Sequence, residues 1–392
     1  MNVLSVKPDN TVLDINLLLN RIYSNQIDNI DLSNKFLPDY TQTPEIIEST
    51  GIKKHDTIYS PMICLSSNKV LTAYRKVLYF WNTNDLSLVD VINTRSSICG
   101  MLELPDGSLL TDHNDWTLKR WHFDTSKLGE ILLTHHKNIC SWTCLPNNIV
   151  AFGNDKGGLE LRHLDTMKLV APVIQGRKSK IYHLAYQNRS HLISIDSNFY
   201  LTRWYLDAFS LDSMTKLEFE ACSLAVYGDG SIFLGDDHGN IYCYDYSSRN
   251  SKTSFKICDR PIWILKILPD NNLIAIDSES TITIIDKTMN RIAKSILLSY
   301  YDVYCSNISN IAILPNGDII LCSKCMGEHK IISLKFPSRA LRYHDLWAIF
   351  DALEKNQSVT SINLSNIQLS KSEIETILYE IPNMRNDIKI IM

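Results

Sequence analysis

The chain has 392 residues, of which 45% are hydrophobic and 21% charged, and its formal net charge is −4 at pH 7. This composition is that of a globular protein, and the length fits one large domain or two to three ordinary ones. The slightly acidic balance excludes the overall basic charge of many nucleic-acid-binding proteins, so no nucleic-acid partner is expected.

We expect neither a membrane span nor a cleaved secretory leader in this sequence. No apolar run approaches the roughly 20 residues that cross a bilayer. Residues 1–9 lack a basic region followed by a long apolar core, so a cleaved Sec-type signal is not expected. The ten cysteines are scattered, mostly in expected strands, where we interpret them as small buried apolar residues rather than as a disulfide framework. Together these features indicate a reducing compartment, and we expect a cytoplasmic protein.

The first expected element is a helix over residues 11–25. Its apolar residues recur at helical spacing, and Asp14 lies in the first turn. The apolar positions are Val12, Ile15, Leu18, Leu19 and Ile22. Residues 30–37 (IDLSNKFL) follow, and residues 44–50 then form an extended segment.

One pattern recurs along the middle of the chain: an apolar strand that ends in a tight turn resembling Pro-Asp-Gly. In such a turn Gly takes the positive-φ position. The copies begin at Leu65, Leu104, Leu145, Tyr186, Tyr227, Leu268 and Leu314, in steps of 39, 41, 41, 41, 41 and 46 residues. A period of about 40–45 residues built from short strands is typical of a β-propeller.

The third strand of several repeats ends in an aromatic residue, as in Trp81-Asn82, Trp121-His122, Trp204-Tyr205 and Tyr244-Asp245. A strand that closes in Trp-Asp, or a softened form of it, resembles the WD40-repeat family over residues 44–337. The family pairs a His before the first strand with an Asp before the third, supported by the Trp.

The repeats of this chain are degenerate by that standard. His136 and Asp155 match the family's pair, but their repeat has Arg162 in place of Trp. The repeats of Trp121 and Trp204 keep Asp115 and Asp196, but they have Arg95 and Ser179 near the His position. Since no repeat keeps the whole network, apolar packing between strands must carry more of the stability.

Seven copies predict seven blades, but the seventh lacks a fourth strand because the sequence turns helical after residue 337. We expect residues 44–50 to supply that outer strand and close the ring, which removes an exposed sheet edge.

The C-terminal part repeats the pattern of the N-terminus. A helix is expected over residues 341–356, with Leu346, Ile349, Phe350 and Leu353 on one face, and residues 362–369 (INLSNIQL) follow it. A further helix over 370–380 begins with the capping box Ser370…Glu373, and 387–391 form a last strand. Residues 30–37 and 362–369 each resemble one unit of a leucine-rich repeat. Because an isolated unit cannot bury its apolar face, we expect the two ends to dock together.

The expected fold class is therefore an all-β main domain with a small α/β module. The main domain is a seven-bladed WD40-like β-propeller over residues 44–338. The module is leucine-rich-repeat-like and is formed by residues 1–43 and 339–392.

The loops that enter the first strands carry basic and aromatic residues, and we predict that they bind a protein. The candidate residues are Arg95, His135, His136, Arg177, Lys178, Arg260, Tyr300 and Tyr301. The turns between second and third strands lie on the same face of a propeller and carry acids such as Asp196 and Asp277. Cations and aromatic residues are typical of interface hot spots. The alternative is that these bases and acids pair locally and hold the blades together.

Other clusters have simpler explanations. Cys322 and Cys325, with His329, resemble part of a zinc site, but no second ligand pair follows, so we interpret the cysteines as strand or turn residues. Residues 113–115 and 236–240 fit hairpin turns. Trp142 and Trp263 are expected in the core. No motif for a metal or cofactor is found.

The most consistent function is a monomeric, non-enzymatic scaffold for protein–protein interaction. The mixture of degenerate WD40-like and leucine-rich-like pieces resembles the effectors that intracellular bacteria secrete into host cells, which implies a host or bacterial protein as partner and host cytoplasm as the site of action. The alternative is a propeller-based hydrolase or lyase with its site at the channel mouth.

Overall fold

The computed structural model describes residues 13–391 of the chain, with gaps. The residues left out within this range are 24–25, 34, 50–60, 66–68, 124–129, 135–138, 189, 246–250, 287–291, 298–305, 315, 326–327, 342–344, 347–348, 351, 354–355, 357, 366, 368 and 385–386. No helix within these limits is long and apolar enough to cross a membrane.

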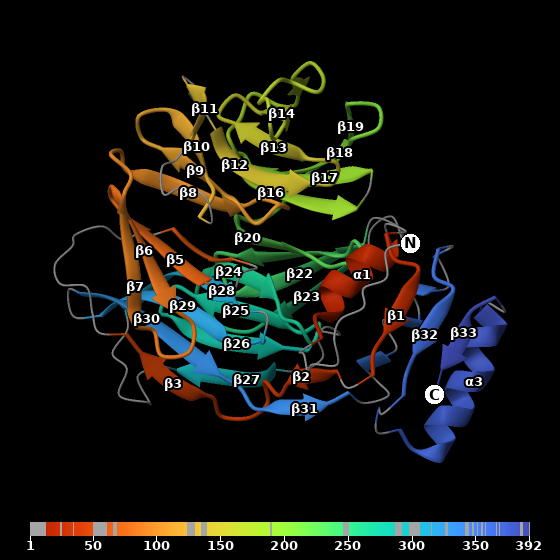
Figure 1. The fold of residues 1–392 in the computed structure, drawn as a ribbon. Coiled ribbons are helices and arrows are strands. Elements are labelled where there is room, and N and C mark those ends of the chain that lie inside the picture. The colour runs from red at the N-terminus through yellow and green to blue at the C-terminus, as the bar shows by residue number, and fades with distance from the viewer. Residues whose placement is uncertain are drawn as a thin grey trace.

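Seven four-stranded antiparallel sheets make up most of the described chain, which confirms the predicted propeller (Figure 1). Blade 1 contains β4 (Met62–Leu65), β5 (Lys69–Tyr74), β6 (Val77–Asn82) and β7 (Leu88–Asn93). Blade 2 contains β8 (Ile98–Glu103), β9 (Leu109–His113), β10 (Thr117–Trp121) and β11 (Glu130–Thr134). Blade 3 contains β12 (Ile139–Leu145), β13 (Ile149–Asn154), β14 (Gly158–His163) and β15 (Ile174–Gln175). Blade 4 contains β16 (Ile181–Asn188), β17 (His191–Asp196), β18 (Tyr200–Tyr205) and β19 (Ser210–Lys216).

The remaining three blades complete the ring. Blade 5 contains β20 (Ala221–Val226), β21 (Ile232–Asp236), β22 (Asn240–Asp245) and β23 (Ser251–Lys256). Blade 6 contains β24 (Ile262–Ile267), β25 (Leu273–Asp277), β26 (Thr281–Ile285) and β27 (Ile292–Leu297). Blade 7 contains β28 (Ser306–Ile313), β29 (Ile319–Cys325), β30 (Glu328–Lys335) and β3 (Glu45–Glu48). The first strands of blades 7 and 1, β28 and β4, contact each other, so the ring is closed.

The recurring turn joins the first and second strands, as the sequence predicts. Gly107, Gly230 and Gly317 have φ values of 79°, 88° and 85°. Their amides donate to the carbonyls of the residues three positions earlier, at 2.9, 2.9 and 2.8 Å. The copies at Leu145 and Leu268 lack glycine and place Asn147, Asn148 and Asn271 at positive φ, and Asn tolerates this conformation better than most side chains.

The N-terminal segment closes the seventh blade, which confirms the prediction from residues 44–50. Strand β3 pairs antiparallel with β30 in the register Glu45↔Lys335 to Glu48↔Ile332. Just beyond it, the Ser49 amide donates to the Ile331 carbonyl at 2.9 Å, and the Ile331 amide donates to the Ser49 hydroxyl at 3.0 Å. Blade 7 is therefore built from two ends of the chain.

The three tryptophans of the third strands each donate a hydrogen bond to a hydroxyl of the second strand. The indoles of Trp81, Trp121 and Trp204 bond to Thr72, Thr111 and Ser194 at 2.9, 2.8 and 2.8 Å. These buried bonds fix the second and third strands of three blades to each other.

The other hydrogen bonds that hold the blades differ from the His–Asp pair of WD40 repeats, because serines take part in them. In blade 2, Ser96 rather than Arg95 occupies the interior, and its hydroxyl lies 2.9 Å from Nδ1 of the buried His113. Thr111 contacts the other ring nitrogen of His113 at 2.8 Å. In blade 4, the Ser179 hydroxyl donates to the Asp196 carboxylate, so serine stands where the family has histidine.

Segments from both ends of the chain share one small parallel sheet beside the propeller (Figure 1). Its strands, in the order β1-β32-β33, are β1 (Asn29–Asp31), β32 (Ser361–Asn363) and β33 (Lys389–Ile391). Helices α1 (Ile15–Tyr23) and α3 (Lys371–Met384) accompany this sheet, and the described residues between 345 and 353 are also helical. A two-stranded antiparallel sheet of β2 (Phe36–Pro38) and β31 (Ser338–Ala340) lies between the parallel sheet and the propeller (Figure 1). We call this unit the terminal module.

One apolar cluster holds the terminal module together. It contains Ile15, Leu19 and Ile22 of α1, together with Phe350 and Ile362 from the C-terminal side, all at most 1% exposed. At the start of α3 the Ser370 amide donates to the Glu373 carboxylate at 2.7 Å, and the Glu373 amide donates to the Ser370 hydroxyl at 3.3 Å. This confirms the predicted capping box.

Asn356 ties the two ends of the chain together. It is 1% exposed, and its amide nitrogen donates to the carbonyl of Ile22 at 2.5 Å. Its side-chain oxygen accepts from the amides of Ser358 and Val359 at 2.9 and 2.7 Å. These three bonded groups belong to the backbone, and Ile22 and Val359 are buried while Ser358 is partly buried.

We expect Asn356→Ala to lower the free energy of unfolding by about 2–3 kcal/mol, because it leaves buried backbone groups without their partner. Urea denaturation followed by circular dichroism measures this change. Asn84 is exposed and provides the control, since Asn84→Ala should stay within about 0.5 kcal/mol of wild type. Equal stability of the two variants would contradict the structural role of Asn356.

Candidate functional site

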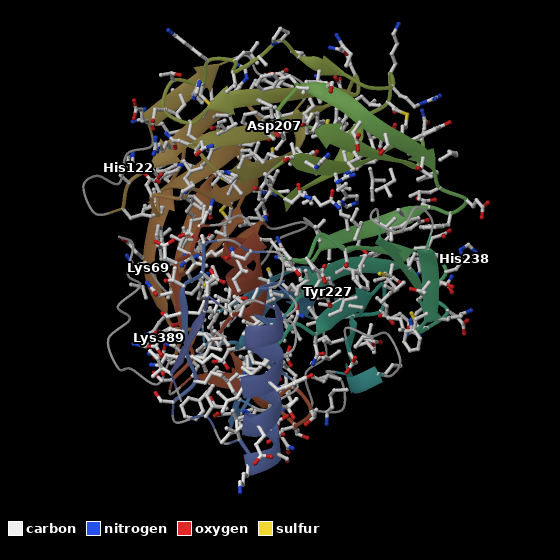
Figure 2. All side chains as sticks on the ribbon, turned by 90° about the vertical axis from the view of Figure 1, so that its right-hand side faces the viewer. Lys69, His122, Asp207, Tyr227, His238 and Lys389 are labelled. Atoms are coloured by element: carbon white, nitrogen blue, oxygen red, sulfur yellow. The ribbon has the colours of Figure 1, made fainter. Side chains whose placement is uncertain are left out.

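The terminal module occupies one face of the propeller, the face that carries the recurring turns. The Ile15 amide donates to the carbonyl of Pro269 at 2.9 Å, and the Tyr40 hydroxyl donates to the carbonyl of Gly317 at 2.7 Å. In Figure 2, which looks from the side of α3, Lys389 of the module and His238 of a second-to-third turn lie on opposite sides of the view. Because strands alternate in direction, the loops that enter the first strands open on the face opposite to the module.

On that opposite face, the first strand of blades 2 to 7 carries a β-bulge near its start. In each blade the register between first and second strand shifts across one residue, and this residue has no partner in the ladder. The bulged residues are Cys99, Cys140, Tyr182, Cys222, Trp263 and Asn307. A bulge re-aims a side chain and often marks a functional rim.

Two of the bulged residues are large and exposed. Tyr182 is 50% and Trp263 45% exposed, although both belong to the innermost strands of their blades. The expectation that Trp263 is a core residue is therefore wrong, because the bulge turns it out of the sheet. Trp142 does pack inside, with its ring 6.1 Å from that of Phe152.

Stacked aromatic rings and cations extend this surface over blades 3 to 5. The Arg177 guanidinium lies 4.1 Å from the ring centre of Tyr200, and the Lys216 ammonium approaches the same ring at 5.0 Å. Phe219 and Tyr242 stack with their ring centres 3.9 Å apart. Such rings present broad apolar area at little cost in side-chain entropy, as interface hot spots do.

The predicted site residues divide into three groups. Arg95, Arg177 and Lys178 are exposed on the open face. Arg260 pairs locally, with Nε 2.8 Å from the buried Asp277 carboxylate and Nη1 3.2 Å from Glu279, so for this residue the local-pairing alternative describes the geometry. His135, His136, Tyr300 and Tyr301 lie outside the described residues.

The loop of Arg177 rests directly on Gly157, in the turn between the second and third strands of blade 3. Gly157 has a φ of +76°, and a Cβ at this position would lie 1.5 Å from the carbonyl oxygen of Arg177. The amide of Gly176 donates to the carbonyl of Gly157 at 3.0 Å. Close backbone contact thus sets where Arg177 and Lys178 stand.

The acidic turns on this face serve the backbone, which confirms the interpretation of residues 236–240 as a hairpin turn. One Asp236 oxygen accepts from the amides of His238 and Asn240 at 2.9 and 2.7 Å, and the other accepts from the Tyr242 hydroxyl at 3.1 Å. Asp196 and Asp277 each accept two turn amides in the same way. Asp236, Asp237 and His238 lie close enough together to hold a cation, but hydrogen bonds of the turn occupy the buried carboxylate.

The cysteines are free thiols in the part of the chain that the structure describes, and they are less buried than the sequence suggested. Cys322 is buried, whereas Cys99 is exposed and six others are intermediate. Burial raises the pKa of Cys144 and of Cys222 to about 11. Cys322 and Cys325 both lie in strand β29, as the sequence indicated.

Sequence reasoning missed Tyr182, Trp263 and Tyr200 as parts of this surface. The available signal was the aligned position of the bulged residues, each directly after the first residue of its strand. Without the bulges, that position is indistinguishable from an ordinary alternating strand residue.

No family model matches the chain, and no curated protein does. Among solved structures, the WD40 beta propeller domain of Doa1 is similar, with a TM-score of 0.59 and 14% sequence identity. The match covers 74% of this chain and 96% of that domain. At this identity the likeness shows the fold, a WD40-type β-propeller.

Proposed function

We propose that this chain is a non-enzymatic scaffold that binds a protein partner across the open face of the propeller, over blades 3 to 6. The observation that carries the proposal is the pair of exposed aromatic residues, Tyr182 and Trp263, which bulges turn outward at the first strands. The neighbouring Arg177 and Tyr200 extend the same kind of surface. Propellers typically serve as interaction scaffolds.

We also propose that the strands of the terminal module derive from leucine-rich-like units. Residues 30–37 and 362–369 share one sequence pattern, and β1 and β32 pair in parallel with Ile30 opposite Ile362. Parallel stacking of equivalent strands is how such units bury their apolar residues.

The combination of these two degenerate repeat types supports a role as an effector that an intracellular bacterium delivers to host cytoplasm. The partner is then a host protein, and the chain needs no cofactor of its own. A hydrolase or lyase at the channel mouth would need unengaged acids and histidines there, whereas the Asp236 carboxylate is bonded within its turn.

The test compares partner capture by the full chain with that of two variants. Tyr182→Ala combined with Trp263→Ala removes the aromatic pair, and loss of hot-spot residues should weaken binding of a captured protein about 30-fold or more. Leu378→Ala combined with Tyr379→Ala removes two exposed apolar residues of α3 and serves as the matched control, which should bind as wild type does.

Capture from host-cell lysate with quantitative mass spectrometry identifies the partner, and titration of the purified partner gives its affinity. Equal capture by the aromatic variant, with an unchanged thermal unfolding curve, would eliminate the open face as the binding surface.

A further inference from the structure

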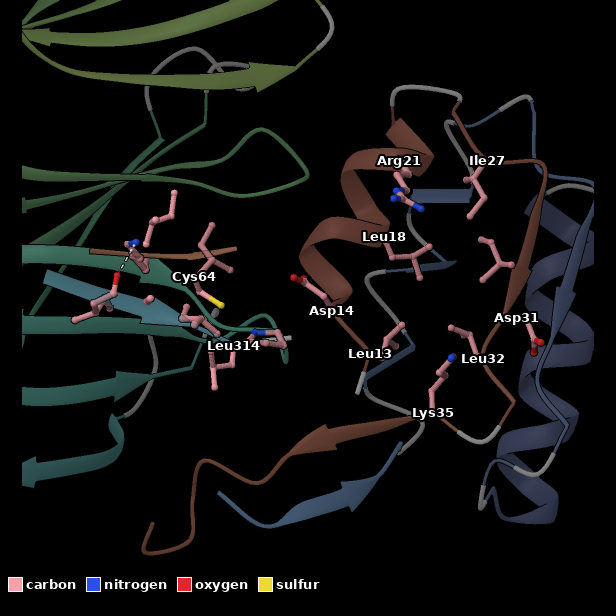
Figure 3. Close-up of a pocket in the computed structure, with 18 of the residues that line it drawn as sticks. Leu13, Asp14, Leu18, Arg21, Ile27, Asp31, Leu32, Lys35, Cys64 and Leu314 are labelled. Atoms are coloured by element: carbon pink, nitrogen blue, oxygen red, sulfur yellow. Dashed lines mark hydrogen bonds between the residues drawn. The ribbon is translucent and has the colours of Figure 1, made fainter. Parts of the chain in front are cut away.

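A cleft of about 680 Å³ lies between the terminal module and the propeller. Figure 3 shows α1 and the β1 segment on one side and strands of the propeller on the other. The propeller side consists of β4, β24 and β28, the first strands of three neighbouring blades. The volume of the cleft is within the range of about 300–1,000 Å³ that small-molecule sites occupy. It is separate from the open face on which the proposed function depends.

The lining of the cleft is mainly aliphatic, from both sides. Leu18 and Ile30 belong to the module, and Met62, Ile267 and Ile313 belong to the propeller. Such a surface favours a hydrocarbon chain, since each buried methylene contributes to affinity.

One charged group on the propeller side has no acidic partner among the described residues. Lys266 lines the cleft and is exposed, and its ammonium donates to the carbonyl of Ile311 at 2.9 Å, as the dashed line in Figure 3 marks. That bond uses one of three N–H donors. Burial alone lowers the pKa of Lys266, and within the described part of the chain no carboxylate opposes this shift. With one donor bonded to Ile311, the ammonium keeps two N–H donors for a ligand that enters the cleft.

The cleft is also lined by two acids and two further cations, and the two acids are stabilised by groups close to them in the sequence. Asp31 accepts hydrogen bonds from the amide and hydroxyl of Ser33, at 3.0 and 2.6 Å. Asp14 precedes the first turn of α1, where the helix dipole stabilises a negative charge. Arg21 and Lys35 add positive charge to the lining. The lining is thus mainly apolar, with Arg21, Lys35 and Lys266 as its cations and Asp14 and Asp31 as its acids.

We propose that this cleft binds an amphipathic monocarboxylate, with its aliphatic chain along the apolar lining and its carboxylate against the Lys266 ammonium. The ligand carboxylate accepts from the N–H donors of Lys266 that the Ile311 carbonyl does not use, and the aliphatic chain contacts both the module and the propeller. A charge-assisted hydrogen bond of this kind is among the stronger polar contacts that a protein makes.

Isothermal titration of the full chain with decanoate tests the proposal. We expect saturable binding, with affinity rising about fourfold per added methylene from hexanoate to decanoate. Decyltrimethylammonium has the same chain with a positive head group, and it should bind at least tenfold more weakly. No saturable binding of decanoate, an affinity independent of chain length, or equal binding of the cation would overturn the proposal.

Three variants test whether the ligand carboxylate binds at Lys266. Lys266→Met keeps the aliphatic side chain and should weaken decanoate binding at least tenfold, whereas Lys266→Arg should remain within about threefold of wild type. Lys389→Met removes an exposed lysine of β33 and should leave binding unchanged. Near-ultraviolet circular dichroism reports whether each variant is folded. Unweakened binding by folded Lys266→Met would refute the role of Lys266, and the wild-type series remains decisive if that variant does not fold.

Discussion

Deletion of residues 1–50 is expected to lower Tm by at least about 10 °C, because it removes α1 and β3 together. Ile15, Leu19 and Ile22 of α1 are at most 1% exposed, and burial of each such side chain contributes about 1.5–3 kcal/mol. Their sum is comparable to the whole stability of a typical domain, about 5–15 kcal/mol. Loss of β3 also uncovers the edge of β30 and with it Ile332 and Leu334, which are both 0% exposed.

A shorter deletion separates the two contributions. Removal of residues 1–43 eliminates α1, β1 and β2 but keeps β3 to close blade 7, so its Tm should lie between those of wild type and the longer deletion. Differential scanning calorimetry of the three proteins measures the difference. Identical curves for the two deletions would show that closure by β3 contributes nothing.

Gly157→Ala is expected to cost about 3 kcal/mol or more in the free energy of unfolding. The added methyl group would lie 1.5 Å from the carbonyl oxygen of Arg177 and 2.9 Å from that of Ser179, and both are backbone atoms that cannot rotate away. The positive φ adds about 1–2 kcal/mol of strain for any side chain with a Cβ. The loop of Arg177 and Lys178 must then move, so amide hydrogen exchange should become faster there.

Gly230→Ala is the matched control, because it has the same backbone strain without the collision. Its φ is +88°, and the nearest atoms to an added Cβ lie 3.7 Å away. We expect a cost of about 1–2 kcal/mol and unchanged exchange in the Arg177 loop. If chemical denaturation gives both variants the same stability, contact with the Arg177 loop is not what requires Gly157.

Local signals in the sequence predicted most of the propeller. The turns at Leu104, Tyr227 and Leu314 carry their own chemistry, since Gly at positive φ is required whatever surrounds it. Counting all seven copies of the turn gave seven blades, and the helical sequence after residue 337 indicated a missing strand that residues 44–50 supply. Both inferences depend on patterns within a few residues, so tertiary packing did not alter them.

The candidate site was less predictable, because it depends on pairing between strands. The sequence placed Arg260 on a binding surface, but its partner Asp277 lies 17 positions away in a turn and engages it. Conversely, Trp263 was assigned to the core because it belongs to a first strand. A one-residue bulge turns its side chain outward, and no local pattern marks the bulge. The cleft of Lys266 arises only when the terminal module docks.

Because β3 closes blade 7, the ring can be completed only at a late stage of synthesis. The paired residues Glu45 and Lys335 are 290 positions apart. At about 5–20 residues per second, the ribosome takes roughly 15–60 s to cover that distance. Throughout this time Ile46 and Ile47 have no strand to pair with, while six blades can already form. A nascent chain therefore carries an unpaired strand until its seventh blade forms, and during that interval the strand can pair with blade 7 of a neighbouring chain instead.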